Sequence, residues 1–433
     1  MNNELALLKL LLDNQAFSPS SAVAFEILEA SIPLPRRRVR QLIEKMKLQQ
    51  YMNAKSRQIG SRIFNSFYLT PKGLEFTQQQ QNIQVSPYMI NHHNLELSLT
   101  YREDRLLVQV LSSPSGETSA EGWMSTFRID DLISHTVNQE HGSLWEISKE
   151  IADSLFPDSV RHCYEASMGI ISHNPYTGLR IMLRMEDENV ASIPWELARI
   201  GEDYLSLRPK TPISRYVQAP IPPALPKIDG PIRILGINSN PSDQDQLDII
   251  TEKAVLQNAL APLMNSKIEL TWLDNCTIQD LVDALRQGHD FIHFTGHGYY
   301  SEKHQEGGLI FTNLSGSSQN ISTEWLTILL RDSSIRFIFL NCCESGRSIS
   351  SVAHSLVQRG ITAALGMQAP VEDTLAIAFA DGFYRALSDK WPIDASVVEG
   401  RKSIIAALGG NMNRAEWALP VLYMRSPSGQ LFQ

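Results

Sequence analysis

The chain has 433 residues and a formal net charge of −9, and 43% of its residues are apolar while 20% are charged. This composition excludes a largely disordered chain, and at roughly 100 to 200 residues per domain the length predicts about two to four domains. No stretch approaches the ~18 uninterrupted apolar residues of a membrane span, so we expect no membrane partner.

The cysteines and the N-terminal sequence predict a location. MNNELALLKLLLDNQ carries two acids and no small-residue cleavage site, unlike a secretory signal. The cysteines Cys163, Cys276, Cys342 and Cys343 form no CxxC pair and no regular spacing, so we expect neither a disulfide framework nor a zinc site. The expected location is the reducing cytoplasm.

Residues 1–80 form a basic segment within an acidic chain, with 11 Lys and Arg against 6 Asp and Glu. Leu5, Leu8 and Leu12 are spaced as one face of a first helix, and Ser20 is a candidate cap of a second helix through Val23, Ile27 and Leu28. The run RRRVRQLIEKMKLQQ predicts a third, amphipathic helix. Its apolar positions are Val39, Leu42, Ile43 and Met46, and its solvent-facing cations are Arg36, Arg37, Arg40 and Lys47.

Two strands, at 51–59 and 62–69, are predicted after this helix, and the segment ends in FYLTPKG. This order resembles a winged helix-turn-helix domain, which would span residues 1–77 and be followed by a polar linker at 78–87. In such a domain Arg36, Arg37 and Arg40 would meet the phosphates and guanine edges of DNA. The alternative is a protein-interaction or dimerisation module whose arginines are solvated, so the expected partner is DNA or an activator protein.

The middle region alternates strand-like runs (LELSLTYREDRLLVQVL, GLRIMLRM) with the helical stretch LWEISKEIADSLF. It contains no Gly-rich phosphate loop, no HExxH and no GxSxG. Glu196, beside Trp195, is either a functional acid or a partnered structural residue. The proline-rich segment 218–231 predicts a boundary, which gives a non-catalytic half at 88–225 and a catalytic domain at 226–433.

From Pro231 onwards, short β-rich runs alternate regularly with helices, which predicts an α/β fold with a mainly parallel sheet covered by helices on both faces. Ligands of such sheets bind at the carboxyl ends of the strands. The strand at 290–295 is expected to end in a turn at Gly296, His297 and Gly298, and the strand at 336–340 runs into NCCESG, which contains Cys343. These two strand ends carry the candidate site.

A cysteine attacks as the thiolate, and a nearby imidazole can take its proton and stabilise the anion. Two neighbouring strand ends would bring His297 and Cys343 together although they are far apart in the sequence. The backbone N–H groups of Gly298 and Cys343 are candidates for an oxyanion hole.

The segments GHG, NCCESG, GMQAPVEDTLAIAFADGFYRAL and EWALPVLYMRSP resemble the CHAT domain, a family of caspase- and separase-like peptidases with the caspase fold. The resemblance covers roughly residues 90–433, since IPWEL is similar to the non-catalytic half of the family. It implies that His297 is the base and Cys343 the nucleophile, with no metal or organic cofactor. Cys342 stands where the family pattern has alanine.

Two other interpretations of these residues remain open at this point. His289, His293 and His297 recur every fourth residue and could be metal ligands on a helix, but the Phe- and Ile-rich run favours a strand, and no cysteine or carboxylate cluster completes a metal site. For Cys343 the alternative is an inert buried thiol.

Substrate binding is expected from GMQAPVEDT, which follows the next strand, so that Glu372 and Asp373 would reach the same edge as His297 and Cys343. Resemblance to separases points to Asp373 and to cleavage after a basic residue. The alternative is that both acids are simply the first turn of a helix, where the macrodipole favours them. Asn341 stands where metacaspase-like sequences have aspartate, which removes one pocket acid.

Together these features predict a cysteine endopeptidase that cleaves protein substrates, and the resemblance suggests a role in bacterial antiphage defence. Two alternatives are a DNA-binding regulator that uses the CHAT-like part as a sensor, and a non-hydrolysing scaffold on a peptidase fold. The basic helix favours the first alternative, and the presence of both His297 and Cys343 argues against the second.

Overall fold

The structure is a computed structural model. It describes residues 6–8, 10–11, 14, 16, 22–31, 34–59, 62–70, 72, 90–129, 132–133, 144–174, 176–218, 225, 230–264, 266–301, 303–304, 306–342 and 346–432, without the side chains of 57–59, 62–64 and 346–351. The chain divides into two compact units, one of Met1–His93 with Ile171–Gly178 and one of Asn94–Ile170 with Leu179–Gln433. Each unit is described by itself.

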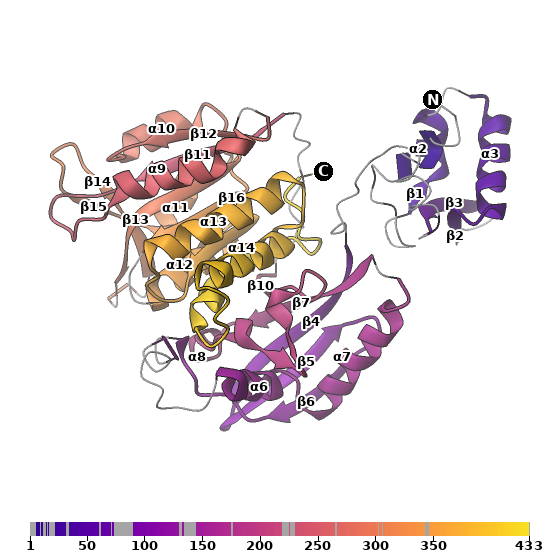
Figure 1. The fold of residues 1–433 in the computed structure, drawn as a ribbon, viewed down its shortest axis with the longest axis horizontal. Coiled ribbons are helices and arrows are strands. Elements are labelled where there is room, and N and C mark those ends of the chain that lie inside the picture. Colours follow the sequence, from indigo (N-terminus) through magenta and orange to yellow (C-terminus); the bar gives the residue numbers. More distant parts are fainter. Residues whose placement is uncertain are drawn as a thin grey trace. The chain divides into compact units, whose positions relative to one another are not determined.

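The first unit contains helices packed on a small antiparallel sheet (Figure 1). Residues 6–8 and 10–11 are helical. The named elements are β1 (Val23–Ala24), α2 (Phe25–Ser31), α3 (Arg36–Leu48), β2 (Met52–Ile59) and β3 (Arg62–Leu69), with the strand order β1-β3-β2. The predicted hairpin is therefore present. Its assignment to the winged-helix class stays a prediction.

Helix α3 buries the apolar face that its spacing predicts. Val39, Ile43 and Met46 are buried, while Leu42 is half-buried. Its arginines Arg36, Arg37 and Arg40 are exposed, and the guanidinium groups of Arg36 and Arg40 lie 5.3 and 5.4 Å from the centre of the Phe25 ring.

Two expectations for this unit are corrected. Val23 lies in β1 rather than in the second helix, because it pairs with Phe67 of β3 and so extends the sheet, a position that suits a β-branched side chain. Lys47 is half-buried and paired with Glu44, rather than free in solvent.

The second unit is built on one large sheet. Its amino-terminal part holds the strands β4 (Asn91–Arg102), β5 (Arg105–Ser112), β6 (Thr118–Gly122), β7 (Thr177–Met185) and β10 (Ile213–Tyr216), with the helices α6 (Leu144–Leu155) and α7 (Asp158–Ile171). Shorter elements connect them: α8 (Glu188–Ala191), η1 (Trp195–Leu197), β8 (Arg199–Ile200), β9 (Asp203–Tyr204) and η2 (Leu205–Leu207).

The carboxyl-terminal part continues the same sheet with β11 (Ile232–Asn238), β12 (Ile268–Leu273), β13 (Phe291–Ser301), β16 (Phe337–Cys342), β17 (Ala363–Met367) and β18 (Pro420–Met424). Strands β12-β11-β13-β16-β17 are parallel neighbours, and β18 is antiparallel to β17. A hairpin of β14 (Glu306–Thr312) and β15 (Ser318–Ser322) pairs with the end of β13. Because β18 also pairs with β10, the sheet runs across residue 225, and the predicted domain boundaries stay predictions.

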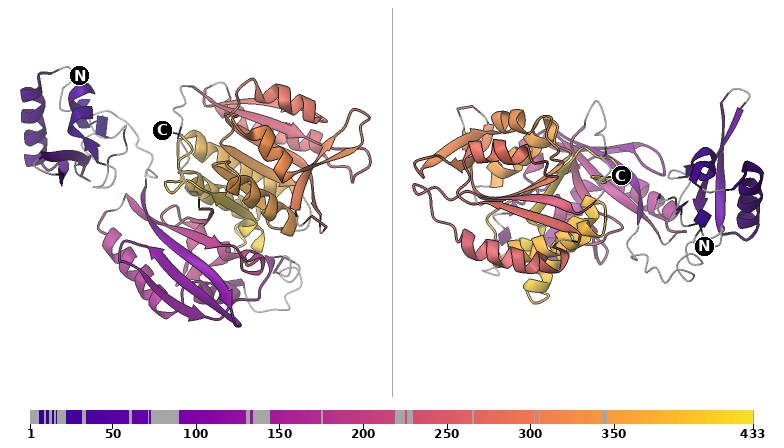
Figure 2. Two further views of the ribbon diagram at one scale, coloured as in Figure 1. Left: turned by 180° about the vertical axis from the view of Figure 1, so that it is seen from behind. Right: turned by 90° about the horizontal axis from the view of Figure 1, so that it is seen from above.

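Helices cover both faces of this sheet (Figure 2), which confirms the predicted fold class. On one face α10 (Ile278–Leu285), α11 (Thr323–Leu330) and α12 (Gly346–Gln358) pack on an apolar cluster that includes Leu235, Ile292 and Leu340. On the other lie α9 (Ile249–Leu260), α13 (Asp373–Ser388) and α14 (Ile393–Ala407), where Phe379 and Phe383 of α13 contact strand phenylalanines at ring-centre distances of 5.6 and 5.3 Å. The remaining elements are η3 (Ala261–Leu263) and η4 (Ala415–Ala418).

Within the described ranges, none of the helices is both long enough and apolar enough to cross a bilayer.

Candidate active site

The carboxyl ends of β13 and β16 meet at one edge of the sheet. Their register pairs Thr295 with Asn341 and Gly296 with Cys342. The described part of this parallel ladder therefore ends on the residues that directly precede His297 and Cys343. Cys343 itself, the predicted nucleophile, lies outside the described residues.

The predicted turn at Gly296–Gly298 is wrong. Strand β13 continues to Ser301, because residues from His297 onwards pair with β14, with His297 opposite Ile310 and Gly298 opposite Leu309. His297 is thus held on a strand with a partner on one side, which fixes its backbone more firmly than a turn would.

Gly296 is required by a close approach of the loop that follows β11. A Cβ atom at this position would lie 2.9 Å from the carbonyl oxygen of Ser239, closer than real Cβ atoms come to backbone. The backbone N–H of Ser239 also donates to the carbonyl of Thr295. The loop after β11 therefore packs directly against the strand that carries His297.

The imidazole of His297 is oriented by the same loop. Its Nε2 lies 2.8 Å from the carbonyl oxygen of Asp245, and the residue is only 6% exposed. A carbonyl oxygen only accepts hydrogen bonds, so Nε2 carries the proton and Nδ1 is the basic nitrogen. This is the tautomer that leaves Nδ1 free to take a proton from a thiol.

Cys342 lies in the core. It is 2% exposed and belongs to the apolar cluster under α10, α11 and α12. A thiol in that position is packed away from solvent, which fits its place as a substitute for alanine.

Asn341 and Thr295 are joined by a residue that sequence reasoning missed, Glu252 of α9. Its Oε1 accepts hydrogen bonds from the Asn341 side-chain amide and from the Thr295 hydroxyl, the latter at 3.1 Å. Glu252 is 8% exposed, and this burial raises the pKa of its carboxyl to about 7. In the sequence it is an acid in the first turn of a helix, a common placement that does not by itself indicate a site.

Glu372 and Asp373 lie at the start of α13, which follows β17. Glu372 occupies the N-cap position with a largely exposed side chain, 3.6 Å from Arg414. Asp373 is exposed, and its charge acts on Glu252, whose pKa it helps to raise. The role of Asp373 and Glu372 in substrate binding stays a prediction, and the helix-terminal position of both acids also fits the alternative interpretation.

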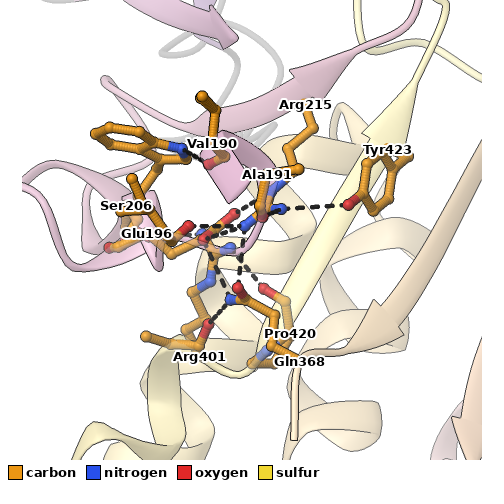
Figure 3. Close-up of polar contacts among 12 residues, drawn as sticks. Val190, Ala191, Glu196, Ser206, Arg215, Gln368, Arg401, Pro420 and Tyr423 are labelled. Atoms are coloured by element: carbon orange, nitrogen blue, oxygen red, sulfur yellow. Dashed lines mark hydrogen bonds and ion pairs between the residues drawn. The ribbon is translucent and has the colours of Figure 1, made fainter. Parts of the chain in front are cut away.

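Glu196 is a partnered structural residue (Figure 3). Its carboxylate is buried and accepts hydrogen bonds from Arg215 at 3.1 and 3.2 Å. Gln368, which directly follows β17, donates to Glu196 and accepts from Arg215. Arg401 lies beside this group, where it donates to the Pro420 carbonyl, and burial lowers its pKa to about 10. The network joins η1 and β10 to the loop before α13.

The histidines at every fourth position do not converge. His293 is buried with Nδ1 3.1 Å from the Tyr384 hydroxyl, and burial lowers its pKa to about 3. The His289 Nδ1 lies 3.1 Å from the Ala284 carbonyl oxygen. In the part of the chain that the structure describes, no three His, Cys, Asp or Glu side chains are grouped as metal ligands would be.

Comparison with known proteins gives one family match. The family model of the CHAT domain matches residues 145–425, which is more than half of the chain. No curated protein sequence matches the chain.

Among solved structures, the chain is similar to the Arg-specific cysteine proteinase gingipain R, with 14% identity over 65% of this chain and 70% of that one and a TM-score of 0.42. It is also similar to a complex of the pro- and mature domains of Porphyromonas gingivalis RgpB, with 12% identity over 70% of this chain and 77% of that one and a TM-score of 0.44. The specificity named for the first protein is a property of that protein.

Proposed function

Because the chain belongs to the CHAT domain family, we propose that it is a cysteine endopeptidase whose catalytic residues are His297 and Cys343. One observation carries the proposal. The ladder between β13 and β16 ends at Gly296 and Cys342, so the two catalytic residues follow paired positions on neighbouring strands. His297 and Cys343 thus each come one residue after a paired position on adjacent strands, and this shared register supports their assignment as a dyad.

The proposed reaction begins with transfer of the Cys343 thiol proton to Nδ1 of His297. The thiolate then attacks the scissile carbonyl carbon, and the N–H groups of Gly298 and Cys343 stabilise the oxyanion. The imidazolium gives its proton to the leaving amine, which breaks the peptide bond and leaves an acyl-enzyme. A water molecule deprotonated by His297 hydrolyses the thioester and restores the thiol. The Asp245 carbonyl supports these steps by holding the ring through Nε2.

We further propose that the residue before the scissile bond is basic, with Asp373 as the acid that binds it and with Glu372 and Asn341 nearby. Burying a cationic side chain requires a carboxylate that offsets its lost hydration. The support is the start of α13 near the dyad edge, where Asp373 acts on Glu252. Peptide-library profiling tests this specificity, and a preference for acidic or small apolar residues would contradict it.

The first unit is proposed to bind an activator protein or DNA. The exposed Arg36, Arg37 and Arg40 support a DNA-binding role, which would make the chain a regulator as well as a peptidase. The role in bacterial antiphage defence and the cytoplasmic location are proposed on the family resemblance and on the cysteine pattern.

The proposed activity is tested by a proteome-wide screen for new N-termini in cells that express the natural chain or the Cys343→Ala variant. Cleavage products that appear only with the natural chain support the peptidase. Cys342→Ala is the matched control, because it removes a neighbouring thiol that lies in the core. Identical sets of N-termini from all three proteins would instead favour the non-hydrolysing scaffold.

A further inference from the structure

Glu252 touches both strands of the proposed dyad at equivalent positions. Thr295 is two residues before His297, and Asn341 is two residues before Cys343, and both donate to the same carboxylate oxygen, Oε1. The second oxygen, Oε2, accepts no hydrogen bond from any residue that the structure describes. The carboxyl therefore has one oxygen bonded to the strand ends and one oxygen that receives no hydrogen bond from the described residues.

The charged groups that act on Glu252 are acids. Asp373 of α13 and Asp248, which caps α9, both disfavour its ionisation. The cations of the neighbouring segments pair with other acids: Lys253 with Asp274, and Arg414 with Glu416 and, at 3.6 Å, with Glu372. Among the described side chains, neither Glu252 nor Asp373 has an ion-pair partner. Within the described part of the chain, this edge of the sheet thus holds two carboxyls without an ion-pair partner, one buried and one exposed.

We propose that Glu252 is a specificity-determining residue: its carboxylate forms the floor of the pocket that binds the basic side chain before the scissile bond, while Asp373 forms the rim. This inference rests on the proposed peptidase function. A guanidinium or ammonium group that reaches Oε2 would supply the missing donor and offset the two negative charges. An exposed acid such as Asp373 is screened by water and discriminates less strongly than a buried one.

The protonation of the Glu252 carboxyl should make the preference for a basic side chain depend on pH. Burial raises the pKa of Glu252 to about 7, and Asp373 and Asp248 add to the rise, so the carboxyl loses its proton over about pH 6 to 8. Binding of a cation favours the ionised form. The preference for a basic over an isosteric neutral side chain should therefore increase with pH across this interval.

Binding to the full-length Cys343→Ala variant tests the proposal without requiring cleavage. Two hexapeptides are compared that are identical except for arginine or citrulline before the intended scissile bond, since citrulline has the shape of arginine without its charge. Their dissociation constants are measured by calorimetry at pH 6 and pH 8. We expect the arginine peptide to bind more tightly by at least about tenfold at pH 8, the effect of one charge-assisted hydrogen bond in a buried site.

Glu252→Gln, in the same Cys343→Ala background, separates specificity from support of the strands. Glutamine keeps an oxygen that can accept from Thr295 and Asn341, so the strand ends stay joined, but it removes the charge. We expect this variant to bind both peptides equally at both pH values with an unchanged melting profile at pH 6. Asp373→Asn, which removes the exposed carboxylate of the rim, should also lower the preference for arginine, but by a smaller factor than Glu252→Gln.

An arginine preference that survives in Glu252→Gln, or the absence of any arginine preference in the parent, overturns the proposal. The proposed peptidase function fails independently, through identical N-termini in the proteome screen. Charge-dependent binding that Glu252→Gln abolishes supports the pocket even if no substrate is cleaved.

Discussion

Replacing Glu196 by alanine should destabilise the second unit more than any surface substitution, because it leaves the buried guanidinium of Arg215 without a counter-charge. The side chains of Glu196 and Arg215 are each 1% exposed, and the carboxylate accepts two hydrogen bonds from the guanidinium. After the substitution, Arg215 keeps only neutral partners, among them Gln368 and Tyr423. Removing one member of a buried ion pair costs about 3 to 5 kcal/mol.

The matched control removes both charges at once. In a Glu196→Leu and Arg215→Met double variant no charge is left buried, and replacing a buried pair by apolar residues of similar volume is often close to neutral. The double variant should therefore be more stable than Glu196→Ala alone. Such a ranking cannot arise if the two residues contribute independently.

Thermal unfolding followed by circular dichroism measures the difference. At about 2 to 4 °C per kcal/mol for a unit of this size, Glu196→Ala should lower the melting temperature by roughly 6 to 20 °C. A decrease below about 2 °C would mean that the buried pair of Glu196 and Arg215 contributes little to the stability of this unit. A double variant that is less stable than Glu196→Ala would show that the hydrogen bonds of Arg215 to neutral groups, rather than the pair, stabilise this region.

Three further results are expected. Cys343→Ala and His297→Ala should each abolish proteolysis with an unchanged melting temperature, whereas Cys342→Ala should keep nearly full activity. Loss of activity in Cys342→Ala alone would show that Cys342, not Cys343, is the nucleophile. Burial lowers the pKa of His293 in the folded state, so the free energy of unfolding decreases as the pH falls below about 6.5, by about 2 kcal/mol at pH 5. The melting temperature of His293→Leu should therefore decrease less from pH 7 to pH 5 than that of the natural chain. In gel-shift titrations at low ionic strength the full chain should bind duplex DNA in a salt-sensitive way. Unaltered binding by a variant with alanine in place of Arg36, Arg37 and Arg40 would contradict the proposed contacts.

The sequence was sufficient where local pattern and tertiary structure agree. The alternation of β-rich runs with helices predicted the covered parallel sheet, and the helical spacing of Val39, Ile43 and Met46 predicted the buried face of α3. The rule that ligands bind at the carboxyl ends of parallel strands selected β13 and β16, which the structure makes neighbours.

Apart from the local pair of Lys47 with Glu44, the errors and omissions involve partners that are not neighbours in the sequence. Glycines on both sides of His297 favour a turn locally, but pairing with β14 keeps the segment extended. Glu252 is an ordinary acid in the first turn of its helix, and only the packing of α9 against β13 and β16 brings it to the strand ends. Neither fact is encoded within a window of a few residues.

The two halves of the second unit are joined by more than sheet pairing. Strand β18 lies between β17 and β10, so this last of the described strands connects the parallel strands β13, β16 and β17 to the preceding half. Side chains also join the two halves: Gln368, a few residues before Asp373, donates to Glu196 and accepts from Arg215. The loop that carries the proposed rim acid is therefore anchored at its start by the amino-terminal half. In this arrangement the amino-terminal half is part of the structure that positions the candidate substrate pocket, because its η1 and β10 residues supply the partners of that anchor.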